Sequence, residues 1–505
     1  MMLFHSYTFI LAFLPISYAL FLLAYKAGGW PMAIRFLGLA SLAYYAQFGL
    51  APVGILIASV VANFVLGRMI IDHRQNGSLA GLLLVAGVVG NIALLGYFKY
   101  SNFLIDIANM ASGGGFSHLS IILPIGISFF TFIQIGYLVE AYSGSVEHQP
   151  FSRYLVFATF FPCITAGPLV LQREIFSQMS GREDQAFNAH RLAVGLTLFG
   201  MGLFKKVVLA DSIAPYADVV FNGAAGGLAV TQVTAWAGAL CYTLQLYFDF
   251  SGYSDMALAL GLIFGLKLPL NFNSPFKATN ISDFWRRWHM TMTRFFTNFI
   301  YTPLAMNGMR RALQSRSNSL VKYVLTAAVP AIVTFLVAGI WHGDGWSFVV
   351  YGLIHGFAIA AYLGWREFKI DMPKPFAWAF TMAVVVTGLV VFRADNLSTA
   401  TTLLASMWAP AIFASADAAA FVDVELRKAF SLIVLLGSIV LLLPNTQQIL
   451  HHKWVSSDPM PTDAPREAGL VRWQATPSSA LAVSVLCCLA LSSLGASSGF
   501  LYYQF

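Results

Sequence analysis

The stretch of sequence that decides the fold is residues 271–303, NFNSPFKATNISDFWRRWHMTMTRFFTNFIYTP. Placed on a helix at ~100° per residue, residues 284–300 separate into an apolar, largely aromatic side and a polar side. The polar side carries the arginines Arg286, Arg287 and Arg294. This pattern predicts one amphipathic helix that lies along a membrane surface instead of crossing the bilayer.

The apolar side of this predicted helix contains a histidine. His289 lies there beside Trp285, and an imidazole that is turned away from water needs a hydrogen-bond partner or a chemical role. Asn280 or Ser282 can cap the start of the helix. His289 is therefore the first candidate for a functional residue.

The composition places the chain in a membrane. Its 505 residues are 58% hydrophobic and 10% charged, with a mean hydropathy of +0.71, which lies outside the range of soluble domains. The net charge of +7 is modest and spread out, so no nucleic-acid partner is expected, whereas anionic membrane lipids or an anionic donor would fit. The four cysteines lack metal-ligand spacing and are expected to be packing residues.

Apolar runs predict an all-α, multi-pass membrane protein. Several uncharged runs, for example residues 36–67 and 323–343, are each long enough to cross ~30 Å of hydrocarbon. With less apolar segments, they predict roughly eleven helices that enter or cross the bilayer. Lys26 and Arg35 flank the first predicted turn, which by the positive-inside rule places the N-terminus outside. The proline-broken segment 160–170 is a candidate re-entrant piece.

Two carboxylates, Asp249 and Asp255, lie in an apolar context. A charge within a membrane is costly and is usually paired or functional. The favoured interpretation is that they bond neighbouring helices or the arginines of residues 284–300. The alternative is a proton-coupled transporter or flippase of lipid-linked cell-envelope sugars, in which these carboxylates bind the protons.

Residues 277–322 contain eight basic residues and a single acid, Asp283. This imbalance predicts a cytoplasmic position. The positive charges either signal topology alone or also bind a polyanionic donor such as the phosphates of coenzyme A.

A second candidate histidine, His342, lies in GIWHGDGW at the end of an apolar run. The flanking glycines allow close backbone approach, and Trp341 can form a cavity wall. A single buried histidine is more often structural, but two in this context favour acid-base chemistry. A neutral imidazole can take a proton from a hydroxyl that attacks an activated acyl group, while a second polar group orients the donor. No short ligand spacing supports metal binding by His289, His342 and His355.

Three motifs occur in order, namely DFSGYSDMALALG at residues 249–261, NFNSPFKATNISDFWRRWHMTMTRFF at 271–296 and GIWHGDGWSFVVYGLIHG at 339–356. With these motifs the chain resembles the membrane-bound O-acyltransferases, MBOAT, and among them the bacterial branch typified by alginate O-acetylase. The resemblance implies one domain over residues 1–505, with catalytic core motifs in 271–355. It also implies a helical bundle, with re-entrant and interfacial helices, around a central tunnel that starts at a cytoplasmic acyl-donor site.

The resemblance further implies residue roles and partners. The catalytic histidine of the family falls on His342, and its second catalytic-site position falls on His289. The residues expected near the donor are Arg286, Arg287, Arg294, Trp285 and Trp341. The implied donor is acetyl-CoA, with no permanently bound cofactor, and the implied acceptor is a secreted polysaccharide reached through a periplasmic acetyltransferase partner. D-alanylation of teichoic acid is a related use that nothing in the chain favours.

The sequence thus predicts an O-acetyltransferase of the bacterial inner membrane that passes acetyl groups across the bilayer to a polysaccharide such as alginate or cellulose. His342 would act as general base, and His289 would position the donor or share the proton. Two alternatives stay open. They are the transporter described above and a scaffold for a polysaccharide synthase.

Overall fold

The computed structural model describes residues 2–180, 188–408, 422–451, 455–456, 472–496 and 499–501. Every regular element in these ranges is a helix, which confirms the all-α prediction. Seven helical segments there are long and apolar enough to cross a membrane, and they are Phe9–Phe48, Leu50–Asp72, Gly77–Ser112, Ala189–Ala225, Ser319–His342, Trp346–Glu367 and Lys374–Arg393. The protein is therefore a multi-pass membrane protein, while the expectation of roughly eleven membrane helices is not confirmed by this count.

The chain divides into two compact units that are interleaved in sequence. The first consists of Met1–Leu203, Tyr253–Leu270 and Thr446–Gly495, and the second of Phe204–Gly252, Asn271–Asn445 and Ala496–Phe505. The core motifs of residues 271–355 all fall in the second unit. The expectation of a single domain stays a prediction.

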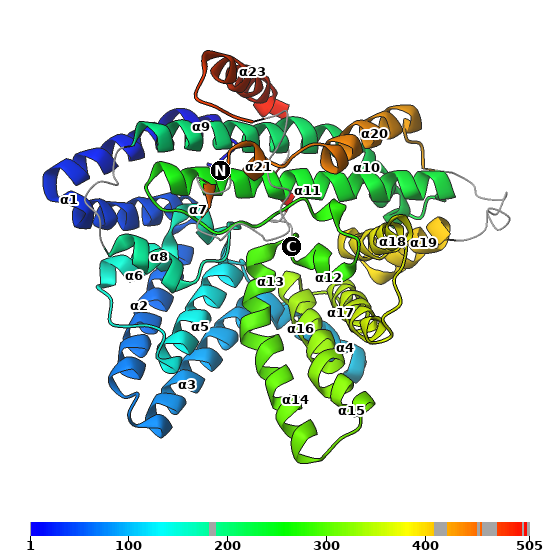
Figure 1. Ribbon diagram of the computed structural model, residues 1–505, viewed down its shortest axis with the longest axis horizontal. Helices are drawn as coiled ribbons and strands as arrows, with labels where there is room; N and C mark the ends of the chain where they lie inside the picture. The colour runs from blue at the N-terminus through cyan, green and yellow to red at the C-terminus, as the bar shows by residue number, and fades with distance from the viewer. Residues whose placement is uncertain are drawn as a thin grey trace. The chain divides into compact units, whose positions relative to one another are not determined.

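The first unit is built around long apolar helices. Its helices are α1 (Leu14–Tyr45), α2 (Leu50–Asp72), α3 (Gly77–Leu95), α4 (Ser101–Ser112), α5 (Ile127–Ser143), α6 (Phe151–Thr159), α7 (Phe161–Ile164), α8 (Gln172–Met179), α9 (Ala189–Phe204), α21 (Thr446–Ile449) and α23 (Pro477–Ser493). Helices α2, α3 and α5 pack together (Figure 1). Asn63 on α2 and Asn91 on α3 donate to each other's side-chain oxygen at 3.2 and 2.7 Å. Such amide pairs hold membrane helices together where no water competes.

Two breaks in the first unit follow from glycine and proline. Helix α1 is kinked at Gly28 and Gly29, where Gly29 has φ +66°, and this is the place of the turn predicted between Lys26 and Arg35. The segment 160–170 forms only the four-residue α7, followed by a turn and residues without regular structure, and all of it is buried. The structure thus confirms a short, broken segment whose backbone is covered by protein, as membrane depth would require.

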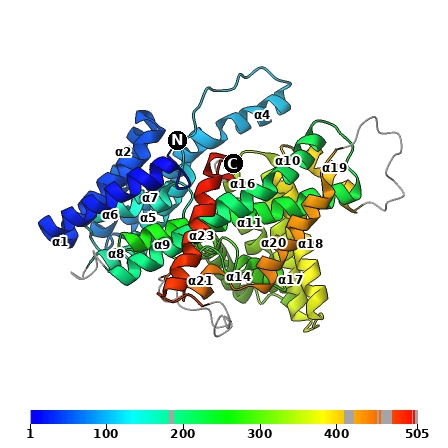
Figure 2. The same cartoon turned by 90° about the horizontal axis from the view of Figure 1, so that it is seen from above.

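The second unit carries the candidate site. Its helices are α10 (Asp211–Ala225), residues 232–252 of α11 (Gln232–Ile263), α12 (Ile281–Trp285), α13 (Met290–Phe296), α14 (Thr302–Gln314), α15 (Ser319–Tyr323), α16 (Val329–His342), α17 (Trp346–Glu367), α18 (Lys374–Arg393), α19 (Leu397–Trp408) and α20 (Leu426–Leu442). Helix α18 packs against both α17 and α19, and α19 also packs against α10 (Figure 2).

The hairpin of α16 and α17 fixes the position of His342. A Cβ at Gly339 would lie 2.3 Å from the Phe348 carbonyl oxygen, and one at Gly352 would lie 2.4 Å from the Phe335 carbonyl oxygen. The two helices are therefore in backbone contact, which only glycine permits at these positions. This contact holds His342, at the end of α16, in a rigid frame.

The membrane carboxylates are held by neighbouring segments. In the second unit, Lys206 Nζ lies 2.8 Å from both Asp249 and Asp211, and the side chains of Lys206 and Asp249 are each 1% exposed. In the first unit, Asp255 accepts hydrogen bonds from Thr446 at 2.8 Å and Gln447 at 3.4 Å. The structural interpretation of these carboxylates fits this geometry, although a lysine and not an arginine is the partner of Asp249.

Candidate active site

The continuous helix predicted over residues 284–300 is wrong. Helix α12 ends at Trp285, and α13 begins at Met290. Between them, the backbone of Met290 donates to the Asn271 carbonyl at 2.9 Å, and that of Asn273 donates to the Arg287 carbonyl at 2.8 Å. These contacts between segments distant along the chain replace the local helical hydrogen bonds. Of the two candidate caps, Asn280 caps α12, because its side chain accepts from the Asp283 backbone at 2.8 Å.

His289 lies at the break in a left-handed backbone conformation, with φ 43° and ψ 51°. This conformation costs a non-glycine residue roughly 1–2 kcal/mol. Such residues persist only where the surroundings fix them, and they concentrate at functional sites. The break turns the His289 side chain into the interior, where it is 1% exposed.

Asn271 fixes the tautomer of His289. Asn271 Oδ1 lies 3.0 Å from His289 Nδ1 and accepts from the Thr291 hydroxyl at 2.9 Å and, more weakly, from the Thr291 backbone N–H at 3.4 Å. Because a backbone N–H only donates, this atom is an acceptor, and His289 Nδ1 must donate to it. Burial lowers the pKa of His289 to about 3, so the ring is neutral and Nε2 is its basic nitrogen.

The two histidines predicted from the sequence lie together. The ring centroids of His289 and His342 are 6.4 Å apart, and His342 is 7% exposed. The Trp341 ring lies 6.2 Å from His289 and 4.9 Å from His342. Trp341 therefore packs against both imidazoles, but it is not among the residues that line the cavity described next, so its expected place near the donor stays a prediction.

Further aromatic rings enclose the pair. Phe250 on α11 packs edge-on against His289 with ring centroids 4.8 Å apart. Phe392 on α18 packs against His342 with ring centroids 5.2 Å apart. Tyr351 lies 6.0 Å from His342. The two histidines thus lie among packed aromatic rings.

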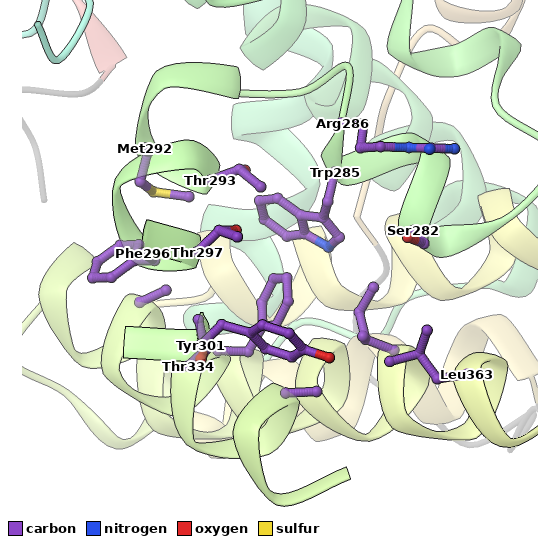
Figure 3. Close-up of a pocket in the computed structure, with 14 residues that line it drawn as sticks. Ser282, Trp285, Arg286, Met292, Thr293, Phe296, Thr297, Tyr301, Thr334 and Leu363 are labelled. Carbon is purple, nitrogen blue, oxygen red and sulfur yellow. The ribbon is translucent and has the colours of Figure 1, made fainter. Parts of the chain in front are cut away.

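A cavity of about 240 Å³ lies beside the pair. Trp285 is one of its lining residues and lies between Met292, Thr293, Phe296 and Thr297 on one side and Ser282 on the other (Figure 3). Most of the lining is apolar, and further lining residues are Arg286, Tyr301, Ala331, Thr334, Phe335, Ala338, Ile359 and Leu363.

The cavity ends close to the two imidazoles. The ring of Phe296, which lines the cavity, packs against that of Trp341 with centroids 6.1 Å apart. Ala338, which also lines the cavity, lies one helical turn before His342. Neither histidine lines the cavity. A tunnel that reaches the pair therefore stays a prediction.

The three arginines are not gathered around the cavity. Arg286 lines it with a side chain that is 66% exposed, and lies 3.3 Å from Asp283. Arg287 pairs with the same carboxylate at 2.9 Å, and neither Arg287 nor the partly buried Arg294 is among the lining residues. Because the helix breaks at His289, the single basic face that the sequence pattern predicts does not form.

Sequence reasoning missed the residues that orient the pair. Asn271 holds His289, the Thr291 hydroxyl donates to Asn271, and Tyr351 packs against His342. A signal for Asn271 was present, since it is a polar residue that directly follows LKLPL, a run that is apolar except for Lys267. The described residues contain no group of three or more histidine, cysteine or carboxylate side chains that could hold a metal ion.

Comparisons with known proteins find a matching family and several relatives. Residues 137–389 match the sequence profile of the membrane-bound O-acyltransferase family. The chain is 37% identical over 436 residues to a peptidoglycan O-acetyltransferase of Helicobacter pylori, covering 80% of each chain. It is 37% identical over 424 residues to a probable alginate O-acetylase of Azotobacter vinelandii, covering 81% of this chain and 78% of that one. A teichoic acid D-alanyltransferase of Streptococcus thermophilus is 29% identical over 259 residues, 50% of this chain and 59% of that one.

Proposed function

The chain belongs to the membrane-bound O-acyltransferase family and is an O-acyltransferase, and we propose that it moves acetyl groups from cytoplasmic acetyl-CoA to a polysaccharide outside the membrane. The observation that carries this proposal is the pair of buried imidazoles, 6.4 Å apart beside Trp341. Two relatives named for O-acetylation of envelope or secreted glycans support acetyl as the group and a glycan as the final acceptor.

In the proposed reaction, His342 takes the proton of the acceptor hydroxyl as its oxygen attacks the thioester carbonyl. A C–O bond forms, the C–S bond breaks, and the proton passes from the imidazole to the departing thiolate. His289 is neutral, with Nδ1–H held by Asn271, and its basic Nε2 can share the proton. The packed aromatic rings exclude water, which would otherwise hydrolyse the thioester.

The cavity around Trp285 is the proposed donor site. Its volume of about 240 Å³ lies below the ~300–1,000 Å³ of pockets that enclose drug-sized ligands, so it suits a narrow acyl-thioester arm better than a whole nucleotide. Arg286, exposed at its edge, can contact a phosphate of the donor. The donor side would face the cytoplasm, which agrees with the basic excess of residues 277–322.

The same proposal includes the cellular setting. The protein would lie in a bacterial inner membrane with its N-terminus in the periplasm, and a periplasmic acetyltransferase would receive the acetyl group and pass it to the polymer. Anionic membrane lipids are further expected contacts of the basic stretch.

The test combines a polymer assay with an assay of the purified protein. His342→Ala should abolish ester-linked acetate on the secreted polysaccharide or peptidoglycan of the producing cell at normal protein level. His73→Ala, which alters an exposed histidine, is the matched control and should leave acetylation unchanged. Full acetylation by His342→Ala would rule out the proposed general base.

The second assay separates the enzyme from the transporter. The wild-type protein in detergent should transfer or hydrolyse labelled acetyl-CoA without any ion gradient. A transporter would work only in sealed vesicles. A scaffold would keep its cellular role after loss of both histidines.

A further inference from the structure

A third buried histidine, His355 on α17, lies apart from the proposed catalytic pair. Its Nδ1 is 3.3 Å from Trp285 Nε1, and the two rings meet edge-on at 90°. An indole N–H can only donate, so His355 Nδ1 accepts, and the proton of the neutral ring must be on Nε2. This is the opposite tautomer to that of His289.

The His355 ring is held from two further sides. A Cβ at Gly388 would lie 2.5 Å from His355 Nε2, so the backbone of α18 passes directly against the ring. The Tyr351 ring packs edge-on against it with centroids 4.7 Å apart. With so little space around it, the ring keeps Nδ1 directed at Trp285.

The partner of His355 is Trp285, whose side chain lines the cavity. The Trp285 indole stands among the lining residues (Figure 3) and packs against Phe335 at 4.9 Å. His355, Ile359 and Leu363 share one face of α17 at intervals of four residues. Ile359 and Leu363 line the cavity, whereas His355 lies behind the indole.

The contact decides what the cavity presents to a ligand. Because the Trp285 N–H is bound by His355 behind the wall, the indole turns apolar ring atoms toward the cavity. Without this acceptor, the buried Trp285 N–H would lose its hydrogen-bond partner. A rotation of the indole that brings the N–H to another acceptor in the cavity would then be favoured. The cavity would then change in both shape and polarity.

We propose that His355 is a positioning residue that holds Trp285 as the wall of the donor site and thereby sets which acyl thioesters fit. The proposal rests on the function proposed above for this cavity. His355 acts through Trp285 and not on the reacting atoms, so its loss should alter donor binding and acyl selectivity more than the chemical step.

The test uses purified variants in detergent, with acetyl-CoA and butyryl-CoA as probes. His355→Leu should raise KM for acetyl-CoA about five- to tenfold, as expected for one lost buried hydrogen bond, with kcat within about twofold. It should also reduce the preference for acetyl-CoA over butyryl-CoA. His355→Asn is the conservative control, because its amide oxygen can reach the place of Nδ1 and should restore most of the wild-type KM.

A double-mutant cycle with Trp285 tests whether His355 acts on donor binding through the Trp285 indole. Trp285→Phe removes the N–H and should match His355→Leu, and the double variant should be no worse than either single variant. This comparison, with His355→Asn, keeps the test decisive if His355→Leu does not fold.

Three outcomes would count against the proposal. A fall in kcat with unchanged KM and selectivity would place the effect of His355 at the reacting groups instead. Equal losses in His355→Asn and His355→Leu would reduce His355 to packing. If the wild-type protein turns over no acyl-CoA, both the proposed donor and the role of His355 are overturned. If the wild type turns over normally and His355→Leu has an unchanged KM, only the role of His355 is overturned.

Discussion

Replacing Asn271 by leucine removes the acceptor that orients His289. The side chains of Asn271 and His289 are each 1% exposed, so no bulk water can take the place of the amide oxygen. The substitution spares the backbone hydrogen bond from Met290 to the Asn271 carbonyl. Its effect should therefore come from the side chain alone.

The magnitude follows from the hydrogen bonds that are lost. Asn271 Oδ1 accepts from His289 Nδ1 at 3.0 Å and from the Thr291 hydroxyl at 2.9 Å. A buried donor left without an acceptor costs about 1–3 kcal/mol, and the hydroxyl can rotate toward another acceptor. We expect a stability loss of about 2–3 kcal/mol and, because the imidazole is no longer fixed in tautomer or direction, a fall in kcat of about 10- to 100-fold.

The assay is turnover of labelled acetyl-CoA by purified protein, with thermal unfolding measured in the same detergent. Thr291→Val is the matched control. It removes the second hydrogen bond to Asn271 and leaves the one to His289, so it should keep most of the activity. Wild-type turnover by Asn271→Leu, or an equal loss in Thr291→Val, would refute the role assigned to the Asn271–His289 contact.

Three other predictions concern charge. Asp249→Asn removes one of two carboxylates that contact the buried Lys206 and should destabilise the protein by about 3 kcal/mol. The thermal midpoint should fall, while the folded fraction should keep its acyl-transfer activity. Loss of function at unchanged stability would instead favour the transporter. Because burial lowers the pKa of His289 to about 3, its ring stays neutral from pH 8 down to about pH 4, and its protonation should cause no loss of activity in that range. Asn271→Asp brings a carboxylate to His289 Nδ1, which stabilises the imidazolium and raises the pKa of His289. Activity that needs the neutral ring should therefore be lost at a higher pH in this variant than in the wild type. Superimposable pH profiles of kcat/KM would contradict this expectation.

Much of the candidate site could be predicted from the sequence because its evidence is local. Long apolar runs predict helices in a membrane, since bilayer thickness sets their length. The glycines that flank His342 predict close backbone approach, and Gly339 makes such a contact with the Phe348 carbonyl oxygen. The position of His289 on an apolar side likewise predicts burial, and the structure confirms it.

The course of the backbone at His289 could not be predicted from the periodicity of residues 284–300. That periodicity is helical, but the chain breaks there because backbone groups of residues 271–273 pair with those of residues 287–290. Periodicity reports which side chains avoid water, and it carries no information about hydrogen bonds between distant segments. For the same reason, the predicted basic face does not form, and only Arg286 of the three arginines lines the cavity.

The sequence by itself determined that this protein is helical, embedded in a membrane and supplied with two histidines in apolar surroundings, because hydrophobicity and residue type are properties of the chain. Only the tertiary structure decided that His289 and His342 meet beside Trp341. It also decided which ring nitrogen carries the proton in two histidines. Asn271 sets it for His289, and Trp285 sets it for His355. A tautomer depends on the partner that the fold brings to the ring, and that partner is distant along the chain.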